Sequence, residues 1–158
     1  MMLSHVLKNN NDGFTLIEMI VTVIVLGVLA AVAVPNLLGA YNRQRANAAI
    51  EQVEGAIKEA QKQAMRNGRA CAINIDNGTR TISGGCLLSN RVFGDYVSLN
   101  SNQNTVAFSA KGTTNTDAMI RVTANGGNVD RCVRVISGIG LIRTGDYDSV
   151  NDECVPRT

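Results

Sequence analysis

Hydrophobic and polar positions divide the chain into stretches with different periods. The first twelve residues are mostly polar, and residues 14–34 are an almost unbroken run of 21 residues rich in Ile, Val, Leu, Met and Ala. Because a helix needs about 20 apolar residues to cross a bilayer core, this run predicts a transmembrane helix. Apolar residues then recur at helical spacing, and the period changes to two from residue 70. We therefore predict a leader (1–13), a transmembrane helix (14–34), an amphipathic continuation of the helix (35–69) and a β domain (70–158).

The amphipathic segment is expected to bury a single stripe against the β domain. Glu54 and Lys58 are four residues apart on another face, which favours an ion pair. Pro35 lacks a backbone donor, so we expect it to bend the helix. The sequence Asn67-Gly68 is typical of a helix end. The predicted buried stripe consists of Ala46, Ala49, Ile50, Val53, Ile57, Ala60 and Ala64.

The β domain is expected to contain several short strands separated by turn residues. The sequence Asn77-Gly78 predicts a hairpin with a tight turn, because these residues adopt positive φ angles readily. An antiparallel sheet lying on the apolar stripe of the helix is the simplest architecture, so the predicted fold class is α+β. The predicted strands are 70–76, 79–83, 91–99, 105–109, 119–124, 129–136 and 140–143.

The junction between the leader and the apolar run holds the most informative residues of the chain. It reads Gly13-Phe14-Thr15-Leu16-Ile17-Glu18, and Glu18 is the one ionisable side chain of the run. An uncompensated charge in a membrane costs about 3 kcal/mol on insertion scales, so an intramembrane carboxylate indicates a function and a partner. The junction resembles the class III signal of type IV prepilins and type II secretion pseudopilins, and this resemblance implies a pilin-like fold.

The resemblance also implies how the chain is processed. A prepilin peptidase would cut between Gly13 and Phe14 and would methylate the new amino group of Phe14. Glycine suits this position because it lets the backbone enter a narrow protease cleft. Glu18 would then offset the amine of a neighbouring subunit, and this pairing would set the register of a growing filament.

Three other interpretations of the apolar run compete with this one. An ordinary signal peptide would be cut at Ala31-Val32-Ala33, but the run exceeds the roughly 7–15 apolar residues of such peptides and contains Glu18. A plain single-pass anchor would keep Glu18 near the membrane interface. A buried core helix of a soluble protein is disfavoured, because 21 apolar residues stand at the start of a small chain.

Within this superfamily, the second half of the chain resembles the H-type pseudopilins and the FimT/FimU-type minor pilins. The resemblance covers five segments, which are residues 60–69, 106–112, 120–122, 131–135 and 138–143. It implies a subunit that primes filament assembly at the tip.

Four cysteines lie in the predicted β domain, outside the cytoplasm. An even number in such a compartment indicates disulfides, and four cysteines allow three pairings. We favour Cys71 with Cys86, at the ends of the first hairpin, and Cys132 with Cys154, which ties the tail to a strand. A zinc site is disfavoured because the chain lacks a Cys-x-x-Cys pair.

Composition argues against an enzyme and gives few hints about ligands. The net charge is +2, and the one histidine, His5, lies in the leader. The sequence lacks the motifs of serine hydrolases, nucleotide-binding loops, zinc proteases and dinucleotide-binding proteins. We therefore expect no catalytic activity, no cofactor and no metal site. Four acidic residues in the tail are read as a solvated loop rather than a calcium site, because their spacing does not match an EF-hand; they are Asp146, Asp148, Asp152 and Glu153.

A nucleic-acid site is the remaining chemical possibility. Some FimT-like pilins act in DNA uptake and carry a Gly-Arg-x-Arg element near the C-terminus, where this chain has Gly140-Leu141-Ile142-Arg143. Arg131, Arg134 and Arg143 would form a small basic face for phosphates. We prefer the interpretation that they are solvated charges, because the aromatic residues do not cluster as a stacking platform.

The sequence therefore predicts a structural subunit, a minor pilin or pseudopilin, of a type IV pilus or type II secretion filament. Its expected partners are other pilin or pseudopilin subunits, the prepilin peptidase and the inner-membrane assembly platform. It is expected to cross the bacterial inner membrane once, with its β domain in the periplasm, before it joins the filament. The alternatives are a major pilin, a DNA-binding minor pilin, and a membrane-anchored binding domain that never polymerises.

Overall fold

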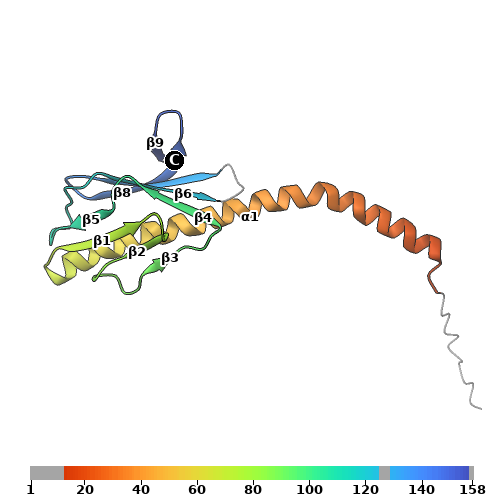
Figure 1. Ribbon diagram of the computed structural model, residues 1–158, viewed down its shortest axis with the longest axis horizontal. Coiled ribbons are helices and arrows are strands. Elements are labelled where there is room, and N and C mark those ends of the chain that lie inside the picture. The colour runs from red at the N-terminus through yellow and green to blue at the C-terminus, as the bar shows by residue number, and fades with distance from the viewer. Residues whose placement is uncertain (1–12, 125–128, 157–158) are drawn as a thin grey trace, which may run out of the picture. The chain divides into compact units, whose positions relative to one another are not determined.

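The computed structural model describes residues 13–124 and 129–156, which form one long helix and nine strands (Figure 1). The chain divides into two compact units, and the boundary lies between Leu38 and Gly39. The elements are α1 (Leu16–Asn67), β1 (Cys71–Asp76), β2 (Thr81–Ser83), β3 (Arg91–Val92), β4 (Val97–Ser101), β5 (Thr105–Phe108), β6 (Ala118–Ala124), β7 (Asp130–Ile136), β8 (Leu141–Asp148) and β9 (Glu153–Pro156).

The described part of the first unit is the apolar half of α1. Its large apolar side chains from Phe14 to Val34 are between 47% and 79% exposed. By length and composition this helix can cross a membrane, and it is the one candidate span among the described residues. Pro35 lies inside α1, and the bend that we predict there stays a prediction. Twelve of the thirteen predicted leader residues, 1–12, lie outside the described part of the chain.

The second unit contains the other half of α1, which is amphipathic as predicted. All seven residues of the predicted stripe, from Ala46 to Ala64, are buried. Lys58 and Glu54 form the expected ion pair on another face of the helix. The helix ends at Asn67, and Gly68 follows with a φ of 60°, a conformation that glycine adopts at little cost. The predicted helix end is confirmed.

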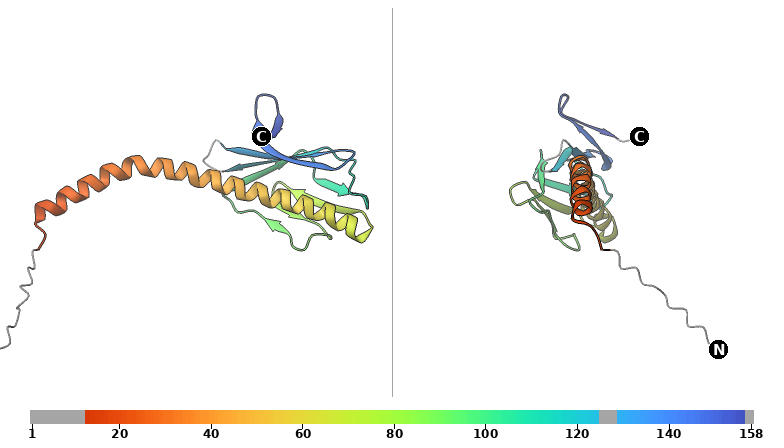
Figure 2. Two further views of the ribbon diagram at one scale, coloured as in Figure 1. Left: turned by 180° about the vertical axis from the view of Figure 1, so that it is seen from behind. Right: turned by 90° about the vertical axis from the view of Figure 1, so that its right-hand side faces the viewer.

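Two antiparallel sheets share one core with this half of α1. The first sheet has the order β3-β2-β1-β5 and the second has the order β4-β6-β7-β8-β9. Figure 2 shows the second sheet along one side of the helix and β1 and β2 along another. Ile57 of the helix, Ile73 of the first sheet and Ile120 of the second are fully buried in one cluster. The predicted α+β fold class is confirmed, with two sheets in place of the single sheet of the simplest architecture.

The predicted tight turn at Asn77-Gly78 is wrong. Asp76 pairs with Thr81, so four residues connect β1 to β2, and the positive φ belongs to Arg80 at 53°. The Asp76 carboxylate accepts hydrogen bonds from the backbone N–H groups of Gly78 (2.8 Å) and Thr79 (3.1 Å). This side chain therefore organises a wider loop, a role that aspartate often has in turns.

The loop also turns Asn77 toward the second sheet. Its side-chain amide donates to the carbonyl of Ser101 (3.2 Å), and its side-chain oxygen accepts from the N–H of Ser101 (3.0 Å). Asn77 thus links the first hairpin to the end of β4.

The predicted strand 91–99 is also wrong, because the structure splits it between the two sheets. β3 pairs with β2, whereas β4 pairs with β6. Phe93 is buried between them, and the ring of Tyr96 folds back over Gly94, where a Cβ atom would lie 2.4 Å from the ring. The chain thus passes from the first sheet to the second between Val92 and Val97, and the Tyr96 ring occupies the space beside Gly94.

The remaining strands differ mainly at the C-terminus. The predicted strands at 105–109, 119–124 and 129–136 match β5, β6 and β7 within one residue at each end. β8 continues to Asp148, beyond the predicted end at residue 143, and pairs with β9, which we did not predict. The polar residues of this hairpin lack the alternation that identifies a strand with one buried face.

Gln61 connects α1 to two loops of the β domain. Its side-chain nitrogen donates to the backbone carbonyls of Gly112 and Gly140, both at 2.9 Å. Both glycines have positive φ angles, 77° and 69°, and a Cβ on either would crowd its neighbours. One helix side chain therefore fixes two turns that lie far apart in the sequence.

We predict that Gln61→Leu lowers the free energy of unfolding by about 1–3 kcal/mol, because two carbonyls lose their donor in a partly buried place. Gln63→Leu is the matched control, since Gln63 makes none of these bonds, and it should stay within about 0.5 kcal/mol of wild type. Urea unfolding of the full-length chain in detergent micelles measures both values. Equal effects of the two variants would contradict the role given to Gln61.

Candidate assembly site

The first residues of α1 form a capping box that the sequence interpretation missed. Thr15 immediately precedes the helix, and its N–H and hydroxyl both donate to Glu18 Oε2 at 3.3 Å. The Glu18 N–H donates in return to the hydroxyl of Thr15, also at 3.3 Å. The pattern Thr-x-x-Glu before an apolar run is the sequence signature of this motif. The Glu18 carboxylate therefore satisfies one backbone donor at the start of the helix, the N–H of Thr15.

Gly13 and Phe14 lie just outside this cap and are open to solvent. A Cβ atom on Gly13 would meet nothing within 4 Å, and Phe14 is 79% exposed. The predicted cleavage bond thus joins two exposed residues beside a fixed helix start. The negative charge of Glu18 stands at the end of α1 where the helix dipole favours an anion.

The β domain is closed by two disulfides. The structure joins Cys71 to Cys86 and Cys132 to Cys154, with Cα–Cα distances of 6.0 and 5.8 Å. These are the pairings that the sequence favours. Gly145, on β8 between the strands of the second disulfide, lies so close to β9 that a Cβ would be 2.0 Å from the Val155 carbonyl oxygen. Glycine is therefore required at position 145 for β8 and β9 to lie this close together.

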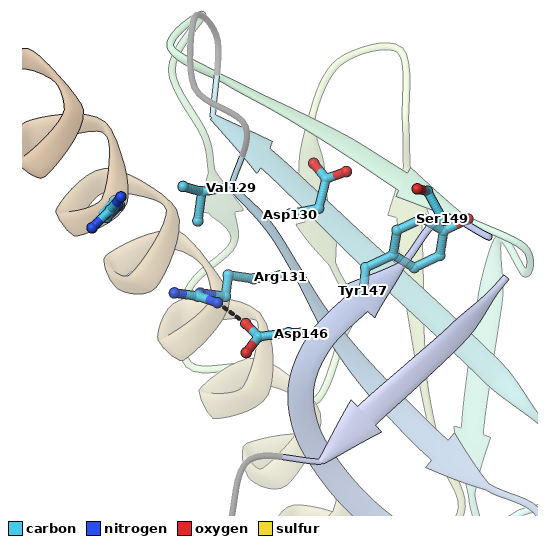
Figure 3. Close-up of a pocket in the computed structure, with 7 residues that line it drawn as sticks. Val129, Asp130, Arg131, Asp146, Tyr147 and Ser149 are labelled. Atoms are coloured by element: carbon cyan, nitrogen blue, oxygen red, sulfur yellow. Dashed lines mark ion pairs between the residues drawn. The ribbon is translucent and has the colours of Figure 1, made fainter. Parts of the chain in front are cut away.

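The three arginines proposed as a basic face do not share one face of the sheet. Arg134 and Arg143 are register partners on β7 and β8, so their side chains lie on the same side. Arg131 is three residues from Arg134 along β7 and lies on the opposite side, because side chains alternate along a strand. Its guanidinium donates to Asn47 of α1 (2.8 Å) and pairs with Asp146, as Figure 3 shows. The structure therefore does not bring the three arginines together on one face, and Arg131 contacts Asn47 and Asp146 instead.

Arg134 and Arg143 also do not concentrate positive charge. Arg134 lies 3.5 Å from a carboxylate oxygen of Asp117 and 3.9 Å from one of Glu153. Of this pair, Arg143 makes none of the ion pairs found among the described residues. One exposed arginine supplies little positive charge for binding a phosphate backbone.

The hollow in Figure 3 joins α1 to β7 and β8 and carries charges of both signs. Asp130 pairs with Arg121 (3.3 Å), whose guanidinium lies 4.5 Å from the centre of the Tyr147 ring. The hollow is lined by Arg43, Val129, Asp130, Arg131, Asp146, Tyr147 and Ser149. Its two carboxylates, those of Asp130 and Asp146, each pair with an arginine.

The carboxylates of the tail have separate partners. The Asp148 carboxylate accepts from the Val150 N–H (2.9 Å) and the Asn151 amide (2.7 Å), and these bonds hold the pKa of Asp148 below its usual value. Asp152 accepts from the Tyr147 hydroxyl (2.6 Å), which raises the pKa of Tyr147. Among the described residues no group of three or more metal-ligating side chains converges.

The N-terminal part of the chain is similar to known proteins. Residues 8–34 match the prokaryotic N-terminal methylation motif. The type II secretion system core protein G of Aeromonas hydrophila is 45% identical over 40 residues, which are 25% of this chain and 27% of that protein. The corresponding protein of Pectobacterium carotovorum is 46% identical over 48 residues, 28% of this chain and 31% of its own length. The chain thus spans under a third of the curated relatives it matches.

Two solved minor subunits share the fold. The type IV minor pilin FimU of Pseudomonas aeruginosa aligns with a TM-score of 0.55 and 20% identity, over 64% of this chain and 88% of that one. The minor pseudopilin EpsH from the type 2 secretion system of Vibrio cholerae aligns with a TM-score of 0.55 and 11% identity, over 65% of this chain and 97% of that one.

The comparisons agree on the fold and on the N-terminal segment. The chain has the fold of these minor pilin and pseudopilin structures, and its N-terminal segment matches the methylation motif. Its long apolar helix fits a membrane-anchored precursor.

We predict that acid loosens the β8–β9 loop specifically. The pKa of Asp148 is lowered in the folded chain, so its stabilising bonds are present above the ordinary aspartate value of 3.8 and are lost as the pH falls through the lower folded value. Amide hydrogen exchange at Val150 and Asn151 should therefore lose protection in that window. Asp148→Ala should remove the protection at all pH values while the Asp76 loop keeps its own acid response, since the pKa of Asp76 is also lowered by bonds within its loop. Equal protection in wild type and Asp148→Ala would contradict this.

Proposed function

We propose that this chain is a structural subunit of a type IV pilus or type II secretion filament, in the role of a minor pilin or pseudopilin. The observation that carries the proposal is the N-terminal arrangement, in which exposed Gly13 and Phe14 precede a capped apolar helix with Glu18 in its first turn. A prepilin peptidase would cut after Gly13 and methylate Phe14. In the hollow of Figure 3 carboxylates face arginines, and such ion pairs agree with a structural role.

Filament assembly would give the apolar half of α1 a protein environment. Its side chains are exposed in the isolated chain, so they need lipid or other helices. In the membrane, the helix would cross once with the β domain in the periplasm, an oxidising compartment that suits the two disulfides. In the filament, helices of neighbouring subunits and the inner-membrane assembly platform would replace the lipid.

Glu18 would have two successive partners in this scheme. It caps its own helix in the isolated subunit, and in the filament it would offset the Phe14 amine of a neighbour. A charge pair in a low-dielectric surrounding is far more favourable than either charge alone. The carboxylate would therefore select the register in which amine and acid meet.

The DNA-uptake alternative is weaker after the arginines are placed, because they do not form one basic face. A membrane-anchored domain that never polymerises would function without the charge of Glu18, whereas a filament subunit would need it for assembly. Substitutions of Glu18 therefore distinguish the two functions.

We predict that the chain isolated from membranes begins at Phe14 and is heavier by one methyl group. Intact mass and N-terminal sequencing, with and without a functional prepilin peptidase, measure this directly. A chain beginning at Val34 would indicate ordinary secretion, and an uncut chain in cells with active peptidase would favour the anchored domain.

We predict that Glu18→Gln reduces incorporation into sheared filaments at least about tenfold, although glutamine is also found at this position of capping boxes. Glu18→Ala removes charge and cap together, so comparing the two variants separates assembly from helix capping. Glu51→Gln is the matched control, because Glu51 lies on the same helix, exposed in the second unit. Normal incorporation of Glu18→Gln would contradict the proposed role of the charge.

A further inference from the structure

Two tyrosines and an arginine stack on one another at the surface of the second unit. The Arg45 guanidinium lies 4.1 Å from the centre of the Tyr41 ring and 4.7 Å from the centre of the Tyr96 ring, and it donates a hydrogen bond to the Tyr41 hydroxyl (2.6 Å). Tyr41 is 48% exposed and Tyr96 is 41% exposed. The loop between β3 and β4 thus brings a second ring to a helix that already carries one. We call these three residues the Tyr–Arg cluster.

The first charges that follow the apolar run are both positive. Residues 19–50 contain Arg43 and Arg45 and no other charged residue. Arg43 is exposed, and neither arginine takes part in the ion pairs found within residues 13–124 and 129–156. Glu51, the next acidic residue, lies about two helical turns beyond Arg43. Carboxylates beside Tyr96 in the sequence and in the hollow with Arg43 already have arginine partners, and these pairs are Asp95 with Arg80, Asp130 with Arg121 and Asp146 with Arg131.

The position of Tyr41 along α1 corresponds to the level where a membrane meets water. It directly follows the exposed apolar residues Leu37, Leu38 and Ala40, and it is seven residues beyond Val34. Seven helical residues rise about 10 Å, and a headgroup layer of roughly 5–8 Å covers each side of a bilayer core. Side chains of a helix tilt toward its N-terminus, which is the direction of the apolar run. When that run spans the core, the side chain of Tyr41 therefore reaches back into the headgroup layer.

The chemistry of the cluster matches that layer. A tyrosine ring has an apolar body and a polar hydroxyl, and such rings are enriched where acyl chains meet headgroups. A guanidinium binds a phosphate through two parallel hydrogen bonds. Arg45 is held between two rings before any ligand arrives, so less side-chain freedom is lost on binding. The cluster thus combines an apolar surface with an oriented phosphate donor.

We propose that the Tyr–Arg cluster, together with Arg43, binds phospholipid headgroups at the membrane surface before the subunit joins a filament. The two rings would lie among the headgroups, and Arg43 and Arg45 would donate to lipid phosphates. This contact would hold the β domain against the bilayer. The inference rests on the membrane-anchored state of the proposed function and adds a lipid ligand to it. It needs no contact between copies of the chain, so it is compatible with a minor subunit.

Fluorescence from position 96 tests the inference, because the chain contains no tryptophan of its own. Full-length Tyr96→Trp is reconstituted in phosphatidylcholine vesicles with and without phosphatidylglycerol, and its quenching by lipids brominated near the headgroup is measured. We expect quenching at least about twofold stronger with phosphatidylglycerol, since anionic lipid attracts the two arginines, and we expect high salt to remove this difference.

Arginine variants of this reporter chain test the charges. Arg43→Gln should weaken the phosphatidylglycerol effect, and Arg43→Gln combined with Arg45→Gln should abolish it. The single variant changes an exposed side chain and leaves Arg45 stacked on the rings. Its partial loss therefore reports the charge without disturbing the cluster.

Ile139→Trp is the matched control, placed in the full-length chain without the substitution at position 96. Ile139 is an apolar residue of the second unit and is 73% exposed. It precedes Gly140, whose carbonyl accepts a hydrogen bond from Gln61. Gln61 is twenty residues beyond Tyr41, which is about 30 Å of helix. The control should therefore show little quenching in either kind of vesicle.

Three results would overturn the inference: equal quenching of Tyr96→Trp in the two kinds of vesicle, equal quenching of the two reporters, or a phosphatidylglycerol effect that both arginine substitutions leave unchanged. A response of Tyr96→Trp that appears only in assembled filaments would indicate a protein partner and would overturn it as well. Carbonate extraction of the same vesicles judges the anchor separately. A chain that resists extraction but is not quenched would remove the lipid contact alone, whereas an extracted chain would also remove the proposed anchor.

Discussion

The structure depends on one helix, α1, whose two halves need different surroundings. Between Leu16 and Leu38 the large apolar side chains that the structure describes are exposed, so this half needs lipids or other helices around it. From Gly39 to Asn67 it buries a single stripe that is rich in alanine. Alanine lets strands approach the helix closely and loses no side-chain entropy on burial. The same element thus contains a candidate membrane span and forms the centre of the domain core.

The β domain compensates for its modest core with specific connections. Gln61 holds two turns to the helix, Asn77 links the two sheets, and Arg131 joins β7 to Asn47 of α1. The two disulfides constrain the chain further, and a disulfide typically contributes about 2–4 kcal/mol. These links anchor loops whose own sequences, rich in Gly, Asn and Thr, have little apolar surface to bury. The domain can therefore display a projecting hairpin without losing its order.

Sequence reasoning succeeded where a period or a chemical rule determines the structure. The helical stripe from Ala46 to Ala64, the helix end at Asn67 before Gly68, and the strands β5 to β7 all follow from spacing and turn chemistry. It failed at two places with local side-chain contacts. The Asp76 carboxylate accepts hydrogen bonds within a wider first hairpin loop, and the Tyr96 ring lies over Gly94 where the chain passes from one sheet to the other. These contacts join residues that no periodic pattern relates. The Thr-x-x-Glu pattern of the capping box is present at Thr15 and Glu18, but Glu18 was interpreted only as a charge within the apolar run.

The capping box bears on how the Glu18 carboxylate could be stabilised in a membrane before it meets the amine of a neighbouring subunit. An uncompensated carboxylate in lipid is costly, yet Glu18 accepts bonds from the N–H and hydroxyl of Thr15 and lies at the positive end of the helix dipole. These interactions lower the cost of the charge before assembly without removing it. A neighbouring amine brings a full positive charge, which exceeds the partial charge of the helix end. In the proposed filament role, the cap would therefore stabilise the subunit before assembly, and the stronger pair would favour the assembled subunit.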